Sequence, residues 1–216
     1  MIDFHSHLLP GVDDGSADLK ESQLMLSSMM SQGVSRVAAT PHFFANHEPV
    51  DSFIKRRNEA YSILCDNLFE GCPEILLGAE VRYYNGISHM EGLEKLTLQN
   101  TRFLLIEMPF KKWTEFSVRE ICDISNMGKY TVVLAHIERY IKRQSNAVIE
   151  RLLQNGVLFQ CNATFFTSTL SSRKAFNMLK KTQIHFLGSD SHNMTSRPPN
   201  TKKALDKMAK RLGCEF

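Results

Sequence analysis

The stretch MIDFHSHLLPGVDDGS, residues 1–16, joins a short apolar run to two histidines and then to a pair of aspartates. In an extended strand, residues i and i+2 point to the same side, so His5 and His7 face one direction. Asp14 follows in a glycine-containing segment that is typical of a loop. A pair of histidines is ambiguous on its own, because buried histidines are usually satisfied core groups. Whether this pair binds a metal depends on what the rest of the chain brings beside it.

Short apolar runs rich in β-forming residues alternate with stretches of helical period along the whole chain. This alternation favours a parallel sheet, and the number of units favours a single α/β domain, residues 1–216, shaped as a barrel rather than an open sheet. The predicted strands are Ile2–His5, Ser35–Thr40, Glu74–Ala79, Phe103–Glu107, Thr131–His136, Val157–Asn162 and Ile184–Ser189. The predicted helices are Leu19–Gln32, Ser52–Phe69, Phe116–Gly128, Asn146–Asn155, Ser172–Lys181 and Asn200–Leu212.

Composition and charge narrow the class of protein. The net charge of +3 is small, and no basic stripe with interleaved aromatics occurs, so we expect no nucleic-acid partner. We find no apolar run long enough to cross a bilayer and no signal-peptide pattern, so we expect no membrane insertion. The 5 cysteines are scattered without a CxxC pair, which is typical of reduced thiols in a cytoplasmic protein.

Side chains of the metal-binding kind follow all but one of the predicted strands. In parallel α/β barrels the chemistry lies at the carboxyl ends of the strands, so we expect these side chains to converge. Charges that converge in one barrel mouth are costly to desolvate unless they are paired or coordinated. The candidate metal ligands, with Asp14 included, are His5, His7, Asp14, His42, Glu80, Glu107, His136, Asp190 and His192.

This ligand set is too large for one ion and predicts two or three, with a carboxylate such as Glu80 as a bridge. Imidazole and carboxylate ligands without thiolate suit Mn²⁺, Fe or Zn²⁺ rather than a structural zinc site. Such a cluster makes hydroxide from water at neutral pH and holds the attacking and leaving oxygens in phosphoryl transfer.

Two arginines follow candidate ligands closely, Arg139 in AHIERY and Arg197 in SDSHNMTSRPP. An arginine can donate two parallel hydrogen bonds to phosphate oxygens. Each alone is equally compatible with a solvated surface loop. Because both flank the same predicted mouth, we predict them as catalytic, phosphate-binding residues.

Several segments resemble motifs of the PHP (polymerase and histidinol phosphatase) superfamily. The resemblance is greater to its bacterial tyrosine-phosphatase branch, encoded with capsular and extracellular polysaccharide genes. The segments are DFHSHLLPGVDDG, ATPHF, LLGAEV, LLIEMPF, LAHIERY and LGSDSHNMTSRPP. Asp14 and Glu107 stand where histidinol-phosphate phosphatases and related PHP proteins often carry histidine, which favours the tyrosine phosphatases.

The resemblance implies a distorted (β/α)₇ TIM-like barrel, the PHP fold, with a trinuclear and usually manganese-supported centre. Residue by residue, it implies one ion on His5, His7, Glu80 and Asp190, a second on Glu80, Glu107 and His136, and a third on Asp14, His42 and His192. It also implies that Arg139 and Arg197 bind phosphate. The substrate it implies is phosphotyrosine, typically on an autophosphorylating bacterial tyrosine kinase that regulates capsular or extracellular polysaccharide synthesis.

We therefore predict a cytoplasmic, metal-dependent protein-tyrosine phosphatase in which a metal-activated hydroxide attacks phosphorus in line. A thiol-based route needs an arginine six positions after a cysteine, and no cysteine of this chain has one. Two alternatives stay open. One is another PHP phosphoesterase such as a histidinol-phosphate phosphatase, and the other is a non-catalytic, metal-containing regulatory protein of polysaccharide assembly.

Overall fold

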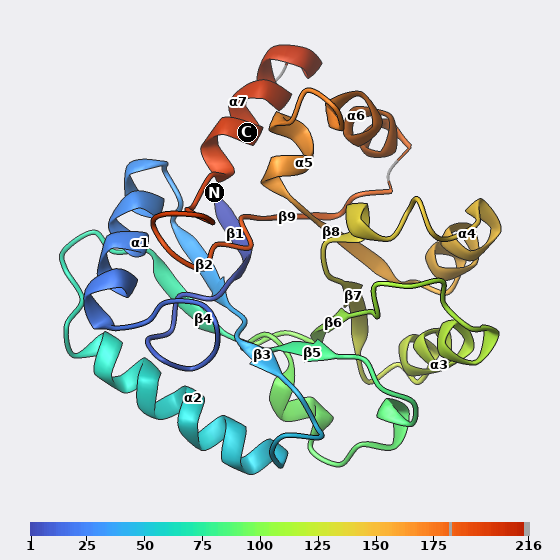
Figure 1. Cartoon of the computed structure of the whole chain (residues 1–216), viewed down its shortest axis with the longest axis horizontal. Coiled ribbons are helices and arrows are strands. Elements are labelled where there is room, and N and C mark those ends of the chain that lie inside the picture. Colours follow the sequence, from blue (N-terminus) through green and yellow to red (C-terminus); the bar gives the residue numbers. More distant parts are fainter. Residues whose placement is uncertain (182, 214–216) are drawn as a thin grey trace.

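Parallel strands occupy the centre of the molecule and helices lie around them (Figure 1). The computed structural model describes residues 1–181 and 183–213. The strands are β1 (Ile2–Ser6), β2 (Arg36–Ala39), β3 (His42–Phe43), β4 (Glu74–Leu77), β5 (Glu80–Arg82), β6 (Phe103–Glu107), β7 (Thr131–Leu134), β8 (Leu158–Asn162) and β9 (Phe186–Gly188). The α-helices are α1 (Leu19–Ser31), α2 (Val50–Cys65), α3 (Glu115–Asn126), α4 (Asn146–Gln154), α5 (Ala163–Thr167), α6 (Ser172–Lys180) and α7 (Thr201–Leu212). Three 3₁₀ helices are η1 (Ile87–His89), η2 (Leu93–Leu96) and η3 (Ile137–Arg139).

The strands pair in two parallel sheets, with the orders β1-β2-β4 and β3-β5-β6-β7-β8-β9. Two predicted strands, Ser35–Thr40 and Glu74–Ala79, are each followed closely by a second short strand that the sequence did not predict, β3 and β5. Pro41 has no N–H for a ladder and separates β2 from β3, and the Gly78–Ala79 step separates β4 from β5. This pairing shows a parallel α/β sheet curled into a half-barrel. It does not by itself show the complete distorted (β/α)₇ barrel that the sequence predicts.

Local sequence explains where the helices begin. Asp18 accepts a hydrogen bond from the N–H of Glu21, and the Glu21 carboxylate accepts one from Ala17, which completes the predicted capping pair of α1. Thr114 and Ser145 cap α3 and α4 in the same way.

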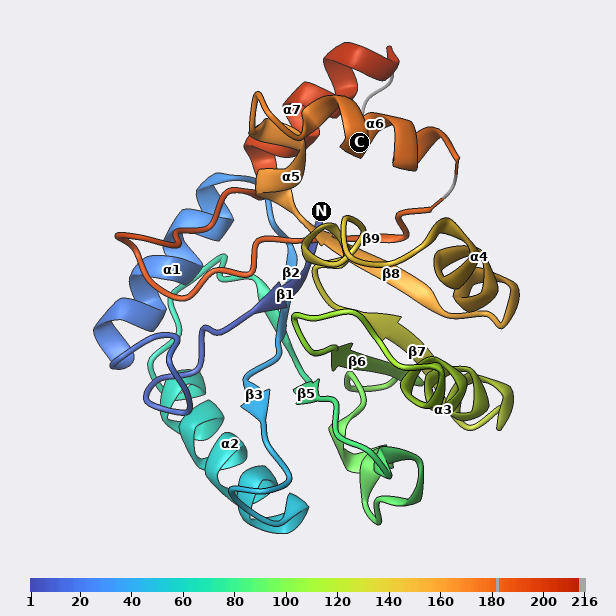
Figure 2. The ribbon, with the colours of Figure 1, turned by 45° about the vertical axis from the view of Figure 1, so that its right-hand side comes forward.

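The helix ends lie close to the predicted ones, with one clear exception. Helix α2 ends at Cys65 rather than Phe69, because the Asn67 side chain donates to the carbonyl of Ile63 and replaces a further helical turn. The sequence analysis missed α5, which lies against α6 and α7 on one side of the molecule (Figure 2). Among the described residues, no helix has both the length and the apolar character needed to cross a membrane.

Two apolar clusters fill the space around the sheets. The larger one joins the strands to the surrounding helices. The smaller one lies between the strands and includes Phe4, Leu105 and Val133, and Phe4 stacks on Phe186 with the ring centres 4.0 Å apart. The register of β1 against β2 shifts between Asp3 and Ser6. Such a bulge re-aims side chains next to a site, and here it includes His5, the first candidate ligand.

Candidate metal centre

The structure brings the nine predicted ligands to one end of the strands. His5 lies in β1, His42 and Glu80 begin β3 and β5, and Glu107 ends β6. The others lie in the segments that follow β1, β7 and β9. Ligand atoms lie within 4.8 Å of one another in three groups, which are His7 with Asp14, His42 and His192; His5 with His7 and Asp190; and His42 with Glu80 and Glu107. His136 joins them through its Nε2, which is 2.9 Å from Oε1 of Glu80 and 3.5 Å from Oε1 of Glu107.

One part of the cluster, which we call the closed end, consists of His5, His7, Glu80 and Asp190. Their side chains are at most 3% exposed. The Nε2 atoms of His5 and His7 are 3.1 Å apart and lie 3.2 and 3.4 Å from the same Glu80 oxygen. Two imidazole nitrogens and one carboxylate oxygen therefore point at a shared space without water access.

The other part, which we call the open end, consists of Asp14, His42 and His192. The Asp14 carboxylate is 68% exposed, and its Oδ1 is 3.6 Å from Nε2 of both histidines. His42 also connects to the closed end, because its Nδ1 is 3.0 Å from Oε2 of Glu80. The two ends therefore form one continuous cluster that runs from a buried floor to the surface.

Hydrogen bonds fix the orientation of three imidazoles. Nδ1 of His7 is 2.6 Å from Asp13, Nδ1 of His5 is 3.2 Å from the amide oxygen of Gln160, and Nδ1 of His192 is 3.0 Å from the backbone carbonyl of Asp190. In the neutral imidazole, Nδ1–H then donates to an oxygen acceptor in each case, and Nε2 is the nitrogen left for a metal ion. This arrangement is typical of metal-ligating histidines.

Unpartnered polar atoms test whether the cluster fits metal ions. Among the described residues, five buried side-chain nitrogen or oxygen atoms make no hydrogen bond, and four of them belong to candidate ligands. They are Nδ1 of His42, Oε2 of Glu80, Nδ1 of His136 and Nε2 of His192. Unsatisfied buried groups are rare and costly, and nitrogen and carboxylate oxygen donors suit divalent cations. The residues present therefore fit divalent metal ions.

The electrostatics of the closed end are those of tightly coupled opposite charges. Burial opposes protonation of His7, but its hydrogen bond to Asp13 and its contacts with Asp190 and Glu80 raise its pKa well above the ordinary value. Burial alone would raise the pKa of Glu80, but the charge of His5, the hydrogen bond from His136 and the close imidazole of His42 lower it. The pKa of Asp190 is lowered by the same histidine charges against the effect of burial. Without ions, protons on the histidines balance the carboxylates.

The two predicted phosphate-binding arginines meet at one atom. Nη2 of Arg139 and Nη2 of Arg197 lie 2.6 and 2.7 Å from Oδ2 of Asp190. Both arginine side chains are 38% exposed, and they line a small cavity of about 190 Å³ together with Asn162 and Thr164. Their remaining N–H groups are thus placed beside the cluster and open to an entering anion.

The backbone is strained or tightly packed at several of these positions. His136 and Asp190 have φ values of 34° and 53°, in the left-handed region that non-glycine residues rarely adopt. A Cβ on Gly188 would lie 2.6 Å from Cβ of His5, so only glycine allows β9 to approach β1 this closely. The cluster geometry is therefore held by the surrounding fold.

Four supporting residues escaped the sequence analysis. Asp13, next to the predicted Asp14, accepts from His7, from the N–H of His42 and from the N–H of Gly15. Arg82 donates to Glu107 across 2.5 Å. Gln160 and Asn162 lie in β8, the strand with no predicted ligand, at positions i and i+2 that share a face. That same spacing was the available signal for them.

Gln160 and Asn162 connect three ligand-bearing segments. The Gln160 amide oxygen accepts from the backbone N–H of His136 at 2.7 Å as well as from His5, and its Nε2 donates to Asn162 at 3.0 Å. Asn162 in turn donates to Oδ2 of Asp190 at 2.8 Å. Strand β8 thus contributes neutral hydrogen bonds where the other strands contribute ligands.

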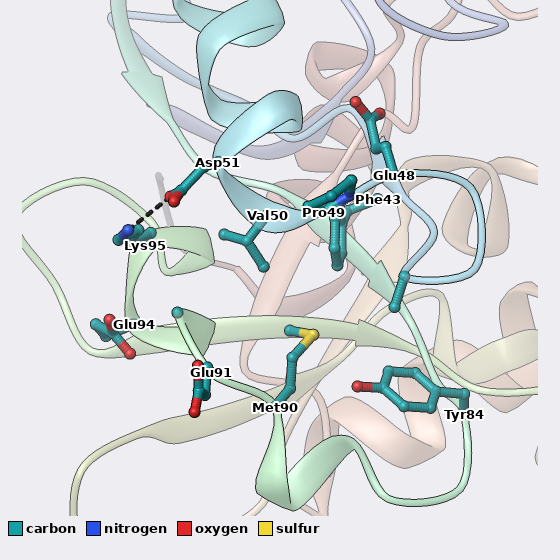
Figure 3. Close-up of a pocket in the computed structure, with 12 residues that line it drawn as sticks. Phe43, Glu48, Pro49, Val50, Asp51, Tyr84, Met90, Glu91, Glu94 and Lys95 are labelled. Atoms are coloured by element: carbon teal, nitrogen blue, oxygen red, sulfur yellow. Dashed lines mark hydrogen bonds and ion pairs between the residues drawn. The ribbon is translucent and has the colours of Figure 1, made fainter.

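The structure also has a cavity of about 530 Å³ (Figure 3). It is lined by Phe43, by the start of α2 and by the segment from Met90 to Lys95, and the Asp51–Lys95 ion pair closes one side. None of the nine candidate ligands lines it. This cavity is therefore distinct from the candidate metal centre, which the unpartnered ligand atoms place at the carboxyl ends of the strands.

Comparison with known proteins gives consistent matches over the whole chain. The family described as "Capsular polysaccharide synthesis, CpsB/CapC" matches residues 1–216. The chain is 31% identical over 223 residues to the tyrosine-protein phosphatase YwqE of Bacillus subtilis, covering 100% of this chain and 87% of that protein. It is 32% identical over 234 residues to the tyrosine-protein phosphatase CpsB of Streptococcus pneumoniae, covering 100% and 92%.

Solved structures give the same relationship. The structure described as YwqE from Bacillus subtilis and CpsB from Streptococcus pneumoniae, "unique metal-dependent tyrosine phosphatases", superposes with a TM-score of 0.85 at 26% identity and covers 100% of this chain and 89% of that one. A putative histidinol phosphatase from Listeria monocytogenes has a TM-score of 0.50 at 13% identity, covering 89% of this chain and 95% of that one. At that identity the likeness shows a shared fold alone.

Proposed function

From the premise that the chain belongs to the CpsB/CapC family of capsular polysaccharide synthesis proteins, we propose that it is a metal-dependent protein-tyrosine phosphatase. The relatives that align with all of it are named tyrosine-protein phosphatases. The observation that carries the proposal is the set of buried ligand atoms without hydrogen-bond partners at the carboxyl ends of the strands. A buried cluster of this composition supports metal-dependent hydrolysis rather than a nucleophilic side chain.

The proposed ligand assignment has three ions, and Glu80 is shared by the first two. His5, His7, Glu80 and Asp190 would hold the first, Glu80, Glu107 and His136 the second, and Asp14, His42 and His192 the third. The closeness of the ligand atoms within each set supports this division. Manganese is the first candidate, and iron and zinc are the alternatives. Divalent ions, when bound, polarise phosphoryl oxygens and lower the pKa of water.

The protein's own residues supply binding and orientation. In the proposed mechanism Arg139 and Arg197 donate their free N–H groups to the equatorial phosphate oxygens while Asp190 aligns both guanidinium groups. The phenol of tyrosine has a pKa of ~10, so the tyrosinate leaves without a strong general acid. No cysteine is needed as a nucleophile, and burial raises the pKa of the Cys122 and Cys161 thiols.

We also propose that residues 1–216 form one domain with the distorted (β/α)₇ arrangement of the PHP fold. Backbone bonds support this proposal at both gaps between the sheets. His7 N–H donates to Ser191 at 2.9 Å and Asp190 N–H donates to His5 at 2.8 Å, which links the segment after β9 to β1. Gly78 N–H donates to Ala39 at 2.9 Å and Glu80 N–H donates to Pro41 at 3.0 Å, beside the short strands β3 and β5.

The proposed substrate is a phosphotyrosine protein, in the first place an autophosphorylating bacterial tyrosine kinase that regulates capsular polysaccharide synthesis. The family description, which is capsular polysaccharide synthesis, supports this biological setting.

The decisive experiment strips the purified chain of metal with a chelator and reloads it with Mn²⁺, Fe²⁺ or Zn²⁺ separately. Phosphotyrosine peptide, phosphoserine peptide and histidinol phosphate are then compared as substrates. We expect phosphotyrosine hydrolysis that is lost on chelation and regained on reloading. Activity that persists in chelator would contradict the proposal, and faster turnover of histidinol phosphate would favour the other phosphoesterase.

A matched pair of arginine variants tests the phosphate contact. Arg139→Ala should raise KM or lower kcat for every phosphate ester without loss of bound metal. Arg36→Ala is the control. Arg36 is an exposed arginine at the end of β2 away from the candidate ligands, and among the described residues its one ion pair is with Glu74 of β4. Equal activity of both variants would remove Arg139 from the site.

A further inference from the structure

Two segments beside the candidate metal centre form one ordered surface, which we call the aromatic–basic platform. It consists of residues 109–113, which follow β6 and Glu107, and residues 140–144, which follow η3 and Arg139. The Gln144 side chain joins the segments, because its Oε1 accepts from the N–H of Trp113 at 3.1 Å and its Nε2 donates to the carbonyl of Lys111 at 2.9 Å. The platform is therefore held in one conformation by its own hydrogen bonds.

Aromatic packing connects the platform to the ligands. The Trp113 ring is buried against Tyr140 with the ring centres 5.2 Å apart, and its Nε1–H donates to the carbonyl of Pro109. Tyr140 is fully buried, and its ring centre is 5.6 Å from that of His136. A molecule bound at the metal centre would thus lie next to a rigid wall rather than a mobile loop.

The outer side of the platform exposes an aromatic ring and several cations. Phe110 is 57% exposed, and the Arg143 guanidinium carbon lies 4.2 Å from the centre of its ring. Lys111, Lys112 and Lys142 are also exposed. Within residues 1–181 and 183–213, no ion pair engages any of these four cations.

The nearest carboxylates do not neutralise this charge. Glu107 is held by Arg82, and Glu115 is held by Arg151. Among the described residues, the exposed ring and its four cations therefore form a basic surface that no ion pair neutralises.

We propose that the aromatic–basic platform docks an acidic polypeptide segment that flanks the phosphotyrosine of the substrate protein. Carboxylates of that segment pair with Lys111, Lys112 and Arg143, and an apolar side chain of the segment packs on Phe110. The inference rests on the proposed function and adds a preference for sequence context. Complementary charge of this kind selects partners and speeds association more than it tightens binding.

The test uses the full chain and three substrates that differ in what they can reach. These are p-nitrophenyl phosphate, a phosphotyrosine peptide with Asp and Glu on both sides, and a matched peptide with Gln and Asn in their place. We expect kcat/KM to favour the acidic peptide roughly tenfold at low salt, as several exposed charge pairs of modest strength would give. The preference should shrink at about 0.5 M salt, where exposed charges are screened.

Two variants locate the preference. Lys111→Glu combined with Lys112→Glu should abolish or invert it while p-nitrophenyl phosphate hydrolysis stays unchanged, and Phe110→Ala should weaken binding of both peptides but not of the small ester. Lys202→Glu combined with Lys203→Glu on α7 is the matched control and should keep the preference.

Equal cleavage of both peptides by the unaltered chain would overturn the inference, as would equal loss of the small ester in the platform variants. Competition by an anionic polysaccharide but not by the acidic peptide would also overturn it. Failure to hydrolyse any of the three substrates with metal present would instead contradict the proposed function.

Discussion

The closed and open ends of the candidate metal centre use the same residue types in opposite environments. At the closed end, His5, His7, Glu80 and Asp190 are almost without solvent contact, and each histidine is oriented by a hydrogen bond to Asp13 or Gln160. At the open end, Asp14 is 68% exposed and is oriented by no hydrogen bond among the described residues. His192, by contrast, is buried and oriented by the Asp190 carbonyl, so the exposed Asp14 carboxylate is the member of the open end without a supporting contact among the described residues.

This difference predicts unequal metal binding. A preoriented, dehydrated ligand set loses little conformational freedom when an ion binds, whereas an exposed carboxylate must give up its freedom and its water. We expect the closed end to bind its ion tightly and the open end to exchange its ion with solvent. The predictions below change each end in turn.

The largest effect should come from Glu80→Gln at the centre of the closed end. Glu80 contacts His5, His7, His42 and His136, so the amide removes a charge that several ligands share. We expect phosphatase activity to fall by about 10³ or more, since metal ions contribute several kcal/mol to such reactions. Metal analysis of the purified variant should show reduced content. An unchanged metal content with full activity would remove Glu80 from the site.

Gln160→Leu should have the next largest effect, because it removes the acceptor of His5 and of the His136 N–H, and also the donor that orients Asn162 toward Asp190. Loss of such a supporting contact costs about 10–100-fold in metal affinity, which titration with Mn²⁺ measures directly. Gln160→Glu keeps the acceptor and should retain most of the affinity. The control is Glu120→Gln, which perturbs a buried side-chain network around Tyr83 and Ser88 that includes none of the candidate ligand side chains. If Glu120→Gln weakens Mn²⁺ binding as much as Gln160→Leu, the role of Gln160 is general stability.

The sequence predicted the nine candidate ligands that the structure brings together. It did not predict the residues that hydrogen-bond to them, such as Asp13 and Gln160. Ligands such as His136 and Asp190 follow apolar runs, and this local signal needs no knowledge of the neighbours. The family resemblance drawn from the same motifs is confirmed by the match over residues 1–216. Gln160 is different, because an amide in a strand has no typical ligand chemistry, and its partners come from other strands of the chain.

Local sequence also did not predict the short strands β3 and β5, or which of Asp13 and Asp14 contacts His7. The sequence DDG offers two carboxylates, and only the turn geometry decides which of them faces His7. The short strands β3 and β5 follow the predicted strands after Pro41 and Gly78, and at Gly78 the neighbouring strand is close, with Thr40 only 3.3 Å from a Cβ placed there. Such contacts depend on register between strands, which distant residues set.

A change of pH should alter metal binding at the closed end by a smaller factor. Burial opposes protonation of His5, but Glu80 and Asp190 raise its pKa, and the pKa of His7 is raised further. Without metal, these protonated histidines stabilise the fold fully below the unfolded pKa of ~6.5, and this stability is lost as pH rises through the raised values. Metal requires the neutral imidazoles, so Mn²⁺ affinity should rise about tenfold per pH unit for each proton displaced.

The measurement is the increase in Tm on adding saturating Mn²⁺, followed from pH 6 to pH 8. It should grow with pH, because the metal-free protein loses stability while the affinity for metal increases. An increase in Tm that is constant across this range would mean that no proton is released on binding, and would argue against histidine ligation at the closed end.

The smallest effect should come from Asp14→Asn at the open end, and its neighbour provides the contrast. An exposed carboxylate without hydrogen bonds contributes little to folding. The free energy of unfolding of the metal-free variant should therefore change by no more than a surface substitution allows, about 0.5 kcal/mol. The affinity of the open end for its Mn²⁺ ion should fall less than tenfold in this variant, and excess Mn²⁺ should restore activity. Asp13→Asn removes the charged acceptor of the His7 bond and should cost about 1.5–3 kcal/mol of stability.

The pair Asp13→Asn and Asp14→Asn therefore measures the difference between the ends within two consecutive residues. Excess Mn²⁺ should rescue the Asp14 variant but not the Asp13 variant, because only the first keeps His7 oriented toward the closed end. If both variants respond equally to Mn²⁺, the orientation of His7 does not depend on Asp13, and burial alone accounts for the contrast between the closed and open ends.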